Sequence, residues 1–138
     1  MHKPLLDSHS IVWVDDDHDD LEVFTKAITE VDPSAHATIL HNGRELLDYL
    51  QHLQQSGKHF PCLIILDINM PLLNGRETLV LMKNTPEYKD LPVVVFTTSA
   101  NPLDKAFCKK FDTVMFTKPH SYNDLKQSIK SILGACAH

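Results

Sequence analysis

Residues 63–75 read LIILDINMPLLNG, an apolar run followed by an aspartate and a loop that contains proline and glycine. Four consecutive apolar residues before such a loop are typical of a strand buried on both faces. Asp67 follows this strand directly, at the end where a parallel sheet holds ligand-binding groups in place. The stretch therefore predicts a functional carboxylate at one edge of a parallel sheet.

Three more apolar runs end in side chains that can do chemistry. These are Asp15, Asp16 and Asp17 after residues 11–14, Thr97 after residues 93–96, and Lys118 after residues 114–117. With Asp67 they supply carboxylates, a hydroxyl and a cation, which can bind a divalent cation and a phosphoryl group. The alternative for the acidic triplet is a solvated helix cap, and Asp17 fits that role better than metal binding. Asp19 and Asp20 suit the positive N-terminal end of the first helix.

Helical patterns lie between the apolar runs, so strands and helices alternate five times along the chain. A short strand is expected at residues 36–41, closed by the turn pair Asn42-Gly43. Asn101 and Ser121 are typical N-cap residues for the last two helices. The apolar helix positions expected to face the core are Leu21, Phe24, Ile28, Val31, Leu46, Leu47, Leu50, Leu53, Leu79, Met82, Leu125, Ile129 and Ile132. This pattern predicts an α/β fold, with helices covering both faces of a parallel sheet.

Size and composition narrow the function classes. A chain of 138 residues has the size of one domain, and its net charge of −5 argues against binding duplex DNA. No signal-peptide core is present, and no apolar stretch reaches the roughly 20 residues that cross a membrane, so we expect a cytoplasmic protein. Cys62, Cys108 and Cys136 show no Cys-x-x-Cys spacing, and a buried free thiol is favoured over a disulfide for Cys62.

The order and spacing of these residues resemble the receiver domain of two-component response regulators, from about Ile11 to Leu133. The matching features are the acidic pair after the first strand, the loop Asp67…Met70-Pro71…Gly75, Thr97, and Lys118-Pro119. Each feature is weakly specific alone, but all occur in order and each follows an apolar run. The resemblance implies a flavodoxin-like (βα)5 three-layer sandwich, with a five-stranded parallel sheet in the order 2-1-3-4-5. It also implies a single receiver domain over residues 1–138, with a core at about residues 9–134 and no output domain.

The resemblance implies a phosphoryl-transfer role for the site. Asp67 is expected to accept a phosphoryl group from a sensor histidine kinase or a histidine phosphotransfer protein. Mg²⁺ is the implied cofactor, bound by Asp16, Asp67 and the backbone carbonyl of Asn69, with Asp15 supporting it through water. The protein would assist only its own phosphorylation and dephosphorylation, and would not be an enzyme toward other substrates.

Two further side chains complete the implied site. Thr97 is expected to hydrogen-bond a phosphoryl oxygen, and is chosen over Thr98 because it directly follows the strand. Lys118 is expected to neutralise the phosphoryl charge, and the resemblance also implies a cis peptide bond before Pro119.

Two features depart from the family pattern. Met115 stands where receivers usually carry Tyr or Phe on the fifth strand, and Phe116 is expected to point to the opposite face. The segment between Asp16 and Asp67 is several residues longer than in a minimal receiver, with the surplus expected within residues 51–60. This resembles a subgroup of stand-alone receivers, some of which serve phytochrome-type kinases.

The output of such a protein is expected to be a protein contact. A downstream partner would bind the face formed by the helix after Asn101, the strand at residues 114–117 and the helix after Ser121. Alternatively, the phosphoryl group would pass on to another histidine, as in a phosphorelay. The sequence leaves the kinase, the target and the choice between monomer and homodimer open.

Two other function classes use a similar strand-end geometry. A haloacid-dehalogenase-like phosphatase also has a strand-end aspartate and Mg²⁺, but it needs a second acid two residues later, where this chain has Asn69. A flavodoxin-like binding module would need Gly, Ser or Thr around a phosphate after the first strand, where residues 15–17 would repel it. Turnover of phosphate esters and flavin absorbance discriminate these alternatives.

Overall fold

The computed structural model describes residues 5–68, 74–98 and 101–134. In these residues five strands alternate with five helices, as the hydrophobic pattern predicts. The elements are β1 Leu6–Val14, α1 His18–Val31, β2 His36–Leu40, α2 Gly43–Gln55, β3 Phe60–Leu66, α3 Gly75–Lys83, β4 Val93–Thr97, α4 Pro102–Lys110, β5 Val114–Thr117 and α5 Tyr122–Leu133.

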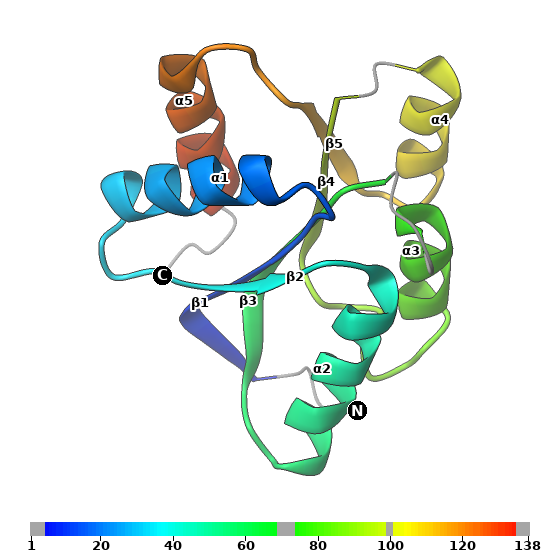
Figure 1. Ribbon diagram of the computed structural model, residues 1–138. Helices are drawn as coiled ribbons and strands as arrows, with labels where there is room; N and C mark the ends of the chain where they lie inside the picture. Colours follow the sequence, from blue (N-terminus) through cyan, green and yellow to red (C-terminus); the bar gives the residue numbers. More distant parts are fainter. Residues whose placement is uncertain (1–4, 69–73, 99–100, 135–138) are drawn as a thin grey trace.

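The strands form one parallel sheet in the order β2-β1-β3-β4-β5, which confirms the predicted topology. Helices α1 and α5 cover one face of the sheet, and α2, α3 and α4 cover the other (Figure 1). Because all five strands run in the same direction, their carboxyl ends meet at one edge. The polar residues that follow the strands are therefore brought to the same edge.

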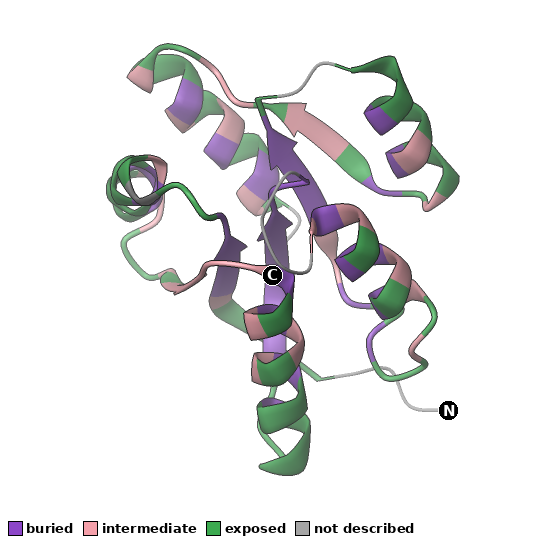
Figure 2. Cartoon of the chain, turned by 45° about the vertical axis from the view of Figure 1, so that its right-hand side comes forward, coloured by how far each residue is buried: buried purple, intermediate pink, exposed green. Residues whose placement is uncertain are grey.

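The core lies on both faces of the sheet, and neighbouring residues of β1 serve different faces. Ile11 and Trp13 pack with residues of α1 and α5, whereas Val12 and Val14 pack with residues of α2 and α3. Trp13 is fully buried and stacks on Phe24, with 4.3 Å between the ring centroids. Figure 2 shows buried residues in the central strands and on the inner sides of the helices. The predicted core positions of the helices are all buried, except that Val31 and Leu47 are half-buried.

Helix starts follow the predicted capping chemistry. Asn101 is the N-cap of α4 and accepts a hydrogen bond from the backbone N–H of Leu103. Ser121 is the N-cap of α5 and accepts from the N–H of Asp124. Asn42, expected in a turn, is the N-cap of α2. Side-chain acceptors at these positions satisfy N–H groups that the first helical turn leaves without intrahelical partners.

Four expectations need correction. β1 starts at Leu6 rather than near residue 11, because it pairs with the start of β3, where Leu6 faces Phe60. β2 ends at Leu40, one residue before the predicted end. Cys62 is disulfide-bonded and not a free thiol. Sequence spacing does not reveal which cysteines meet in a fold. No peptide bond is cis in the described part of the chain, so the bond before Pro119 is trans.

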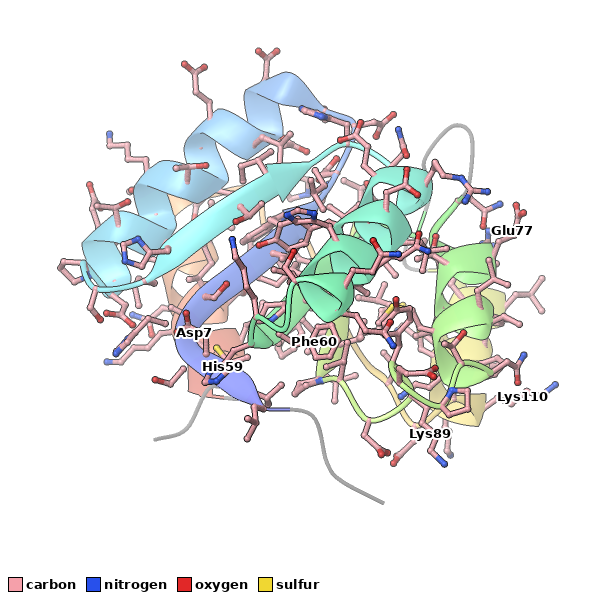
Figure 3. The ribbon with its side chains drawn as sticks, turned by 90° about the horizontal axis from the view of Figure 1, so that it is seen from below. Asp7, His59, Phe60, Glu77, Lys89 and Lys110 are labelled. Carbon is pink, nitrogen blue, oxygen red and sulfur yellow. The ribbon has the colours of Figure 1, made fainter. Side chains whose placement is uncertain are left out.

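The amino ends of the strands form the opposite edge of the sheet, seen from below in Figure 3. Asp7 and His59 are exposed there, whereas Phe60 is buried and contacts Tyr88 edge to face, with 6.0 Å between the ring centroids. Among the described residues, no helix is both long and apolar enough to cross a membrane. At the carboxyl edge, by contrast, polar residues such as Asp15, Asp67 and Thr97 are buried.

Candidate functional site

Backbone hydrogen bonds hold the residues at the carboxyl edge in place. The N–H of Asp15 donates to the carbonyl of Leu40, and the N–H of Asp67 donates to the carbonyl of Val14, both at 3.0 Å. The N–H of Lys118 donates to the carbonyl of Thr97 at 2.8 Å. Each bond crosses to a neighbouring strand. The backbones of Asp15, Asp67 and Lys118 are therefore held in place by hydrogen bonds to neighbouring strands.

Three carboxylates converge at this edge. Asp15, Asp16 and Asp67 each offer an oxygen, and these oxygens all lie within 4.8 Å of one another. Asp15 and Asp67 are buried and Asp16 is exposed. Close carboxylates repel each other when ionised, and a hard divalent cation relieves this repulsion by taking their oxygens as ligands. The donor set is all oxygen, which suits Mg²⁺ or Mn²⁺ better than softer metals.

Lys118 brings a buried positive charge to the acidic cluster. Its side chain is 8% exposed, and its Nζ lies 2.6 Å from Asp15 Oδ2, 3.2 Å from Asp20 Oδ2 and 3.4 Å from Asp67 Oδ2. Burial lowers the pKa of the Lys118 ammonium group, but the hydrogen bond to Asp15 and the charges of Asp67 and Asp15 outweigh burial and raise the pKa to about 12. Lys118 is therefore charged at any physiological pH.

The contact between Asp20 and Lys118 was missed by sequence reasoning, which assigned Asp20 only to the dipole of α1. The two residues are 98 positions apart in the chain. The local sequence gives no reason to choose Asp20 over its exposed neighbour Asp19 as the partner of Lys118. Asp17 caps α1 as predicted, because its side chain accepts hydrogen bonds from the N–H groups of Asp19 and Asp20.

A close approach of two backbone segments requires a glycine at position 75. A Cβ on Gly75 would lie 2.3 Å from the carbonyl oxygen of Asp67 and 2.5 Å from the Cα of Ile68. The N–H of Gly75 donates to the carbonyl of Ile68 at 3.1 Å. The start of α3 thus lies directly against the backbone of Asp67 and Ile68. Asn69, Met70 and Pro71 lie outside the described residues, so the carbonyl predicted from Asn69 stays a prediction.

The two neighbouring threonines differ in burial. Thr97 is fully buried at the end of β4, whereas Thr98 is exposed. Thr98 lines a cavity of about 300 Å³ together with Phe24, Lys118 and His120, among other residues. The role assigned to Thr97 stays a prediction.

Met115 and Phe116 point to opposite faces of the sheet, as predicted. Met115 packs against the buried cluster of Ile68, Val95 and Cys108 on the face covered by α4. Phe116 packs against the cluster that contains Trp13, on the face covered by α1 and α5. The aromatic ring of β5 is therefore absent from the face on which Met115 lies beside Ile68.

Comparison with known proteins gives a family and several solved relatives. The family model described as the response regulator receiver domain matches residues 11–130. Response regulator Rcp1 of Synechocystis sp. is 36% identical over 94 residues, which span 64% of this chain and 64% of Rcp1.

Two solved structures extend the comparison. The phosphorylated cyanobacterial phytochrome response regulator RcpA superposes with a TM-score of 0.82 at 29% identity, over 91% of each chain. The Mn²⁺-bound form of Rcp1 superposes with a TM-score of 0.76 at 30% identity, over 91% of this chain and 92% of that one. Both share the arrangement of strands and helices described above.

Proposed function

Because this chain belongs to the response regulator receiver domain family, we propose that it carries a phosphoryl group on Asp67. The observation that supports this proposal is the convergence of three carboxylates and one buried ammonium group at the carboxyl edge of the sheet. Asp67 is the acidic residue of this cluster that directly follows the central strand β3, and its own backbone lies close to Gly75. We also propose that residues 1–138 form one receiver domain.

The proposed reaction transfers a phosphoryl group from a phosphohistidine of a kinase or a phosphotransfer protein. An oxygen of Asp67 attacks phosphorus, a P–O bond forms and the P–N bond to the histidine breaks, with the imidazole as leaving group. The ammonium group of Lys118, 3.4 Å from Asp67 Oδ2, is placed to neutralise charge on a transferring oxygen. The hydroxyl of Thr97 would hydrogen-bond another oxygen.

Receiver domains bind Mg²⁺ at an acidic pocket, and the donors found here fit that ion. Asp16 and Asp67 would supply carboxylate oxygens, Asn69 its backbone carbonyl, and Asp15 would support the ion through water. When bound, Mg²⁺ supplies positive charge against the carboxylates and the incoming phosphoryl oxygens. The relative solved with Mn²⁺ supports a divalent cation in this role.

The protein is proposed to act as a signalling phosphoacceptor and not as an enzyme toward other substrates. It would promote only its own phosphorylation and the hydrolysis of its own acyl phosphate. The partners would be a sensor histidine kinase or a histidine phosphotransfer protein, in the cytoplasm. The phosphorylated state would be read by a protein that docks on the face formed by α4, β5 and α5, or the phosphoryl group would pass to another histidine.

The test is to phosphorylate the wild-type protein with acetyl phosphate or a phosphorylated kinase, with Mg²⁺ present, and to locate the phosphate by mass spectrometry. We expect one acid-stable, base-labile phosphate on Asp67, and no labelling after removal of the metal with EDTA. Phosphate on a different residue, or full labelling in EDTA, would contradict the proposal.

A further inference from the structure

Helices α3 and α4 are joined by an ion pair with one buried partner. The guanidinium group of Arg76, at the start of α3, contacts Oδ1 of Asp104, in the first turn of α4. The side chain of Asp104 is 2% exposed, and that of Arg76 is 39% exposed. A buried carboxylate without a cation or hydrogen-bond donors would be strongly destabilising. The pair therefore favours one position of α4 relative to α3.

Arg76 is also linked to the proposed phosphoacceptor through Gly75. It follows Gly75, whose N–H donates to the carbonyl of Ile68 and whose Cα is packed on the carbonyl of Asp67. A displacement of the Asp67 backbone would therefore move the residue that precedes Arg76. The two segments lie so close together that a single added Cβ on Gly75 would collide with the Asp67 carbonyl.

The same side of α4 touches the acceptor segment a second time. Cys108 lies four residues after Asp104, so both side chains project from one face of α4. Cys108 is 1% exposed and packs with Ile68, Val95 and Met115. One turn of α4 is thus attached to α3 by charge, and the next turn packs on the residue after Asp67 through an apolar contact.

We propose that Arg76 and Asp104 are a positioning pair that couples the state of Asp67 to the position of α4. This proposal rests on the proposed function, because it assigns the coupling to phosphorylation of Asp67. The phosphoryl group adds charge and volume at the end of β3, next to the backbone on which Gly75 is packed. A movement of Gly75 would then shift Arg76, and the ion pair with the buried carboxylate of Asp104 would shift α4. The flexible Met115 side chain, which adapts to its surroundings, lets Cys108 follow.

The experiment compares wild type, Arg76→Gln and Glu77→Gln. Glu77 is the next residue on α3 and is exposed at the surface (Figure 3), so Glu77→Gln is the matched control for a charge change in the same turn. Backbone NMR shifts are recorded with Mg²⁺, before and after addition of beryllofluoride, which mimics the phosphoryl group. In wild type and Glu77→Gln we expect shifts at residues 66–68 and 74–78 and also along residues 102–110.

In Arg76→Gln we expect the shifts at residues 66–68 to remain and those along residues 102–110 to fall to less than half. Shifts of wild-type size along residues 102–110 in this variant would overturn the coupling proposal. Absence of any beryllofluoride response in the wild type would instead contradict the proposed function, so the two failures are distinguishable. The double variant Arg76→Gln with Asp104→Asn removes the negative charge of the buried carboxylate as well, and should reproduce the loss of coupling in a stably folded protein.

Alkylation of Cys108 supplies a second readout, followed by mass spectrometry of the peptide that contains it. Cys108 is a free, buried thiol, so it reacts only when α4 opens. We expect alkylation about tenfold faster in Arg76→Gln, the factor for losing one hydrogen bond to a charged group. Burial, and then Asp104, raises the pKa of the Cys108 thiol, whereas Arg76 lowers it. Removing Arg76 would by itself slow the reaction, so an accelerated reaction reports opening. An unchanged or slower rate would count against the proposal.

Discussion

The two ends of the sheet are built from the same strands but hold different kinds of side chain. At the carboxyl end, Asp15 and Asp67 are buried together with the ammonium group of Lys118, which is 2.6 Å from Asp15. At the amino end, Phe60 packs on Tyr88, and charged residues such as Asp7 are exposed to solvent. Asp7 and His59 in Figure 3 are examples of this second arrangement.

The difference indicates a division of tasks between the two ends. Buried charges lower stability unless they are paired, so their concentration at one end marks that end as the candidate for function. The aromatic contacts at the other end contribute stability and need no ligand. Substitutions at the carboxyl end should therefore change phosphorylation, and substitutions at the amino end should change the free energy of unfolding. Four experiments test this comparison.

The largest effect is expected from Asp67→Asn. An amide is a poor nucleophile compared with a carboxylate, so labelling from acetyl phosphate should fall by at least about a thousandfold. The measurement is the initial rate of phosphate incorporation in the presence of Mg²⁺. Asp7→Asn makes the same chemical change on an exposed residue at the amino end and should leave the rate unaltered. Equal losses in both variants would refute the proposed division.

The next effect is expected from Lys118→Met, which keeps much of the side-chain volume but removes the charge. Losing one group that stabilises developing negative charge typically slows a reaction by about 10² to 10³. We therefore expect phosphotransfer from the kinase to fall within that range, measured by radiolabel transfer under single-turnover conditions. Lys89→Met, at an exposed site away from the acidic cluster (Figure 3), is the control and should transfer phosphate at the wild-type rate. A wild-type rate in Lys118→Met would remove Lys118 from the mechanism.

Phe60→Ala tests the amino end. Phe60 is 9% exposed and its ring packs on Tyr88, so its truncation should lower the free energy of unfolding by about 3 kcal/mol. Urea denaturation followed by circular dichroism measures this change. Tyr88→Phe keeps the ring and loses only its hydrogen bond to Gln54, which should cost about 1 kcal/mol. The labelling rate of the folded Phe60→Ala protein should stay within about twofold of wild type, as expected for distant independent sites. A large loss of labelling would mean that the two ends are coupled.

The smallest effect is expected for the metal. Mg²⁺ at a hundred times its dissociation constant should stabilise the wild-type protein by about 2.7 kcal/mol. Asp16→Asn should lose most of this increment, and should be more stable than wild type without metal because one repelling charge is gone. Thermal unfolding with and without Mg²⁺ measures both changes. Asp48→Asn removes an exposed carboxylate of α2 and should keep the full increment. The same increment in Asp16→Asn and wild type would place the ion elsewhere.

The hydrophobic pattern of the chain is enough to predict the fold class and to select most residues of the candidate site. Hydrophobic runs report burial of a strand, and the residue after each run must lie at the carboxyl edge once the strands are parallel. Asp15, Asp67, Thr97 and Lys118 were found in this way, because each is adjacent in sequence to the pattern that positions it. Helix caps such as Ser121 follow from the same local logic.

Contacts between residues far apart in the chain become visible once the elements are packed together. Lys118 reaches Asp15 across 103 positions of the chain, and Arg76 reaches Asp104 across 28. The extension of β1 back to Leu6 could not be predicted from the sequence either. That segment is mostly polar and exposed, and its pairing with β3 holds it in the strand. Backbone propensity and hydrophobic periodicity act between near neighbours, whereas an ion pair, a disulfide or a strand register depends on how separate elements pack. For this reason the chemistry at the strand ends could be predicted, and the proposed coupling between α3 and α4 could not.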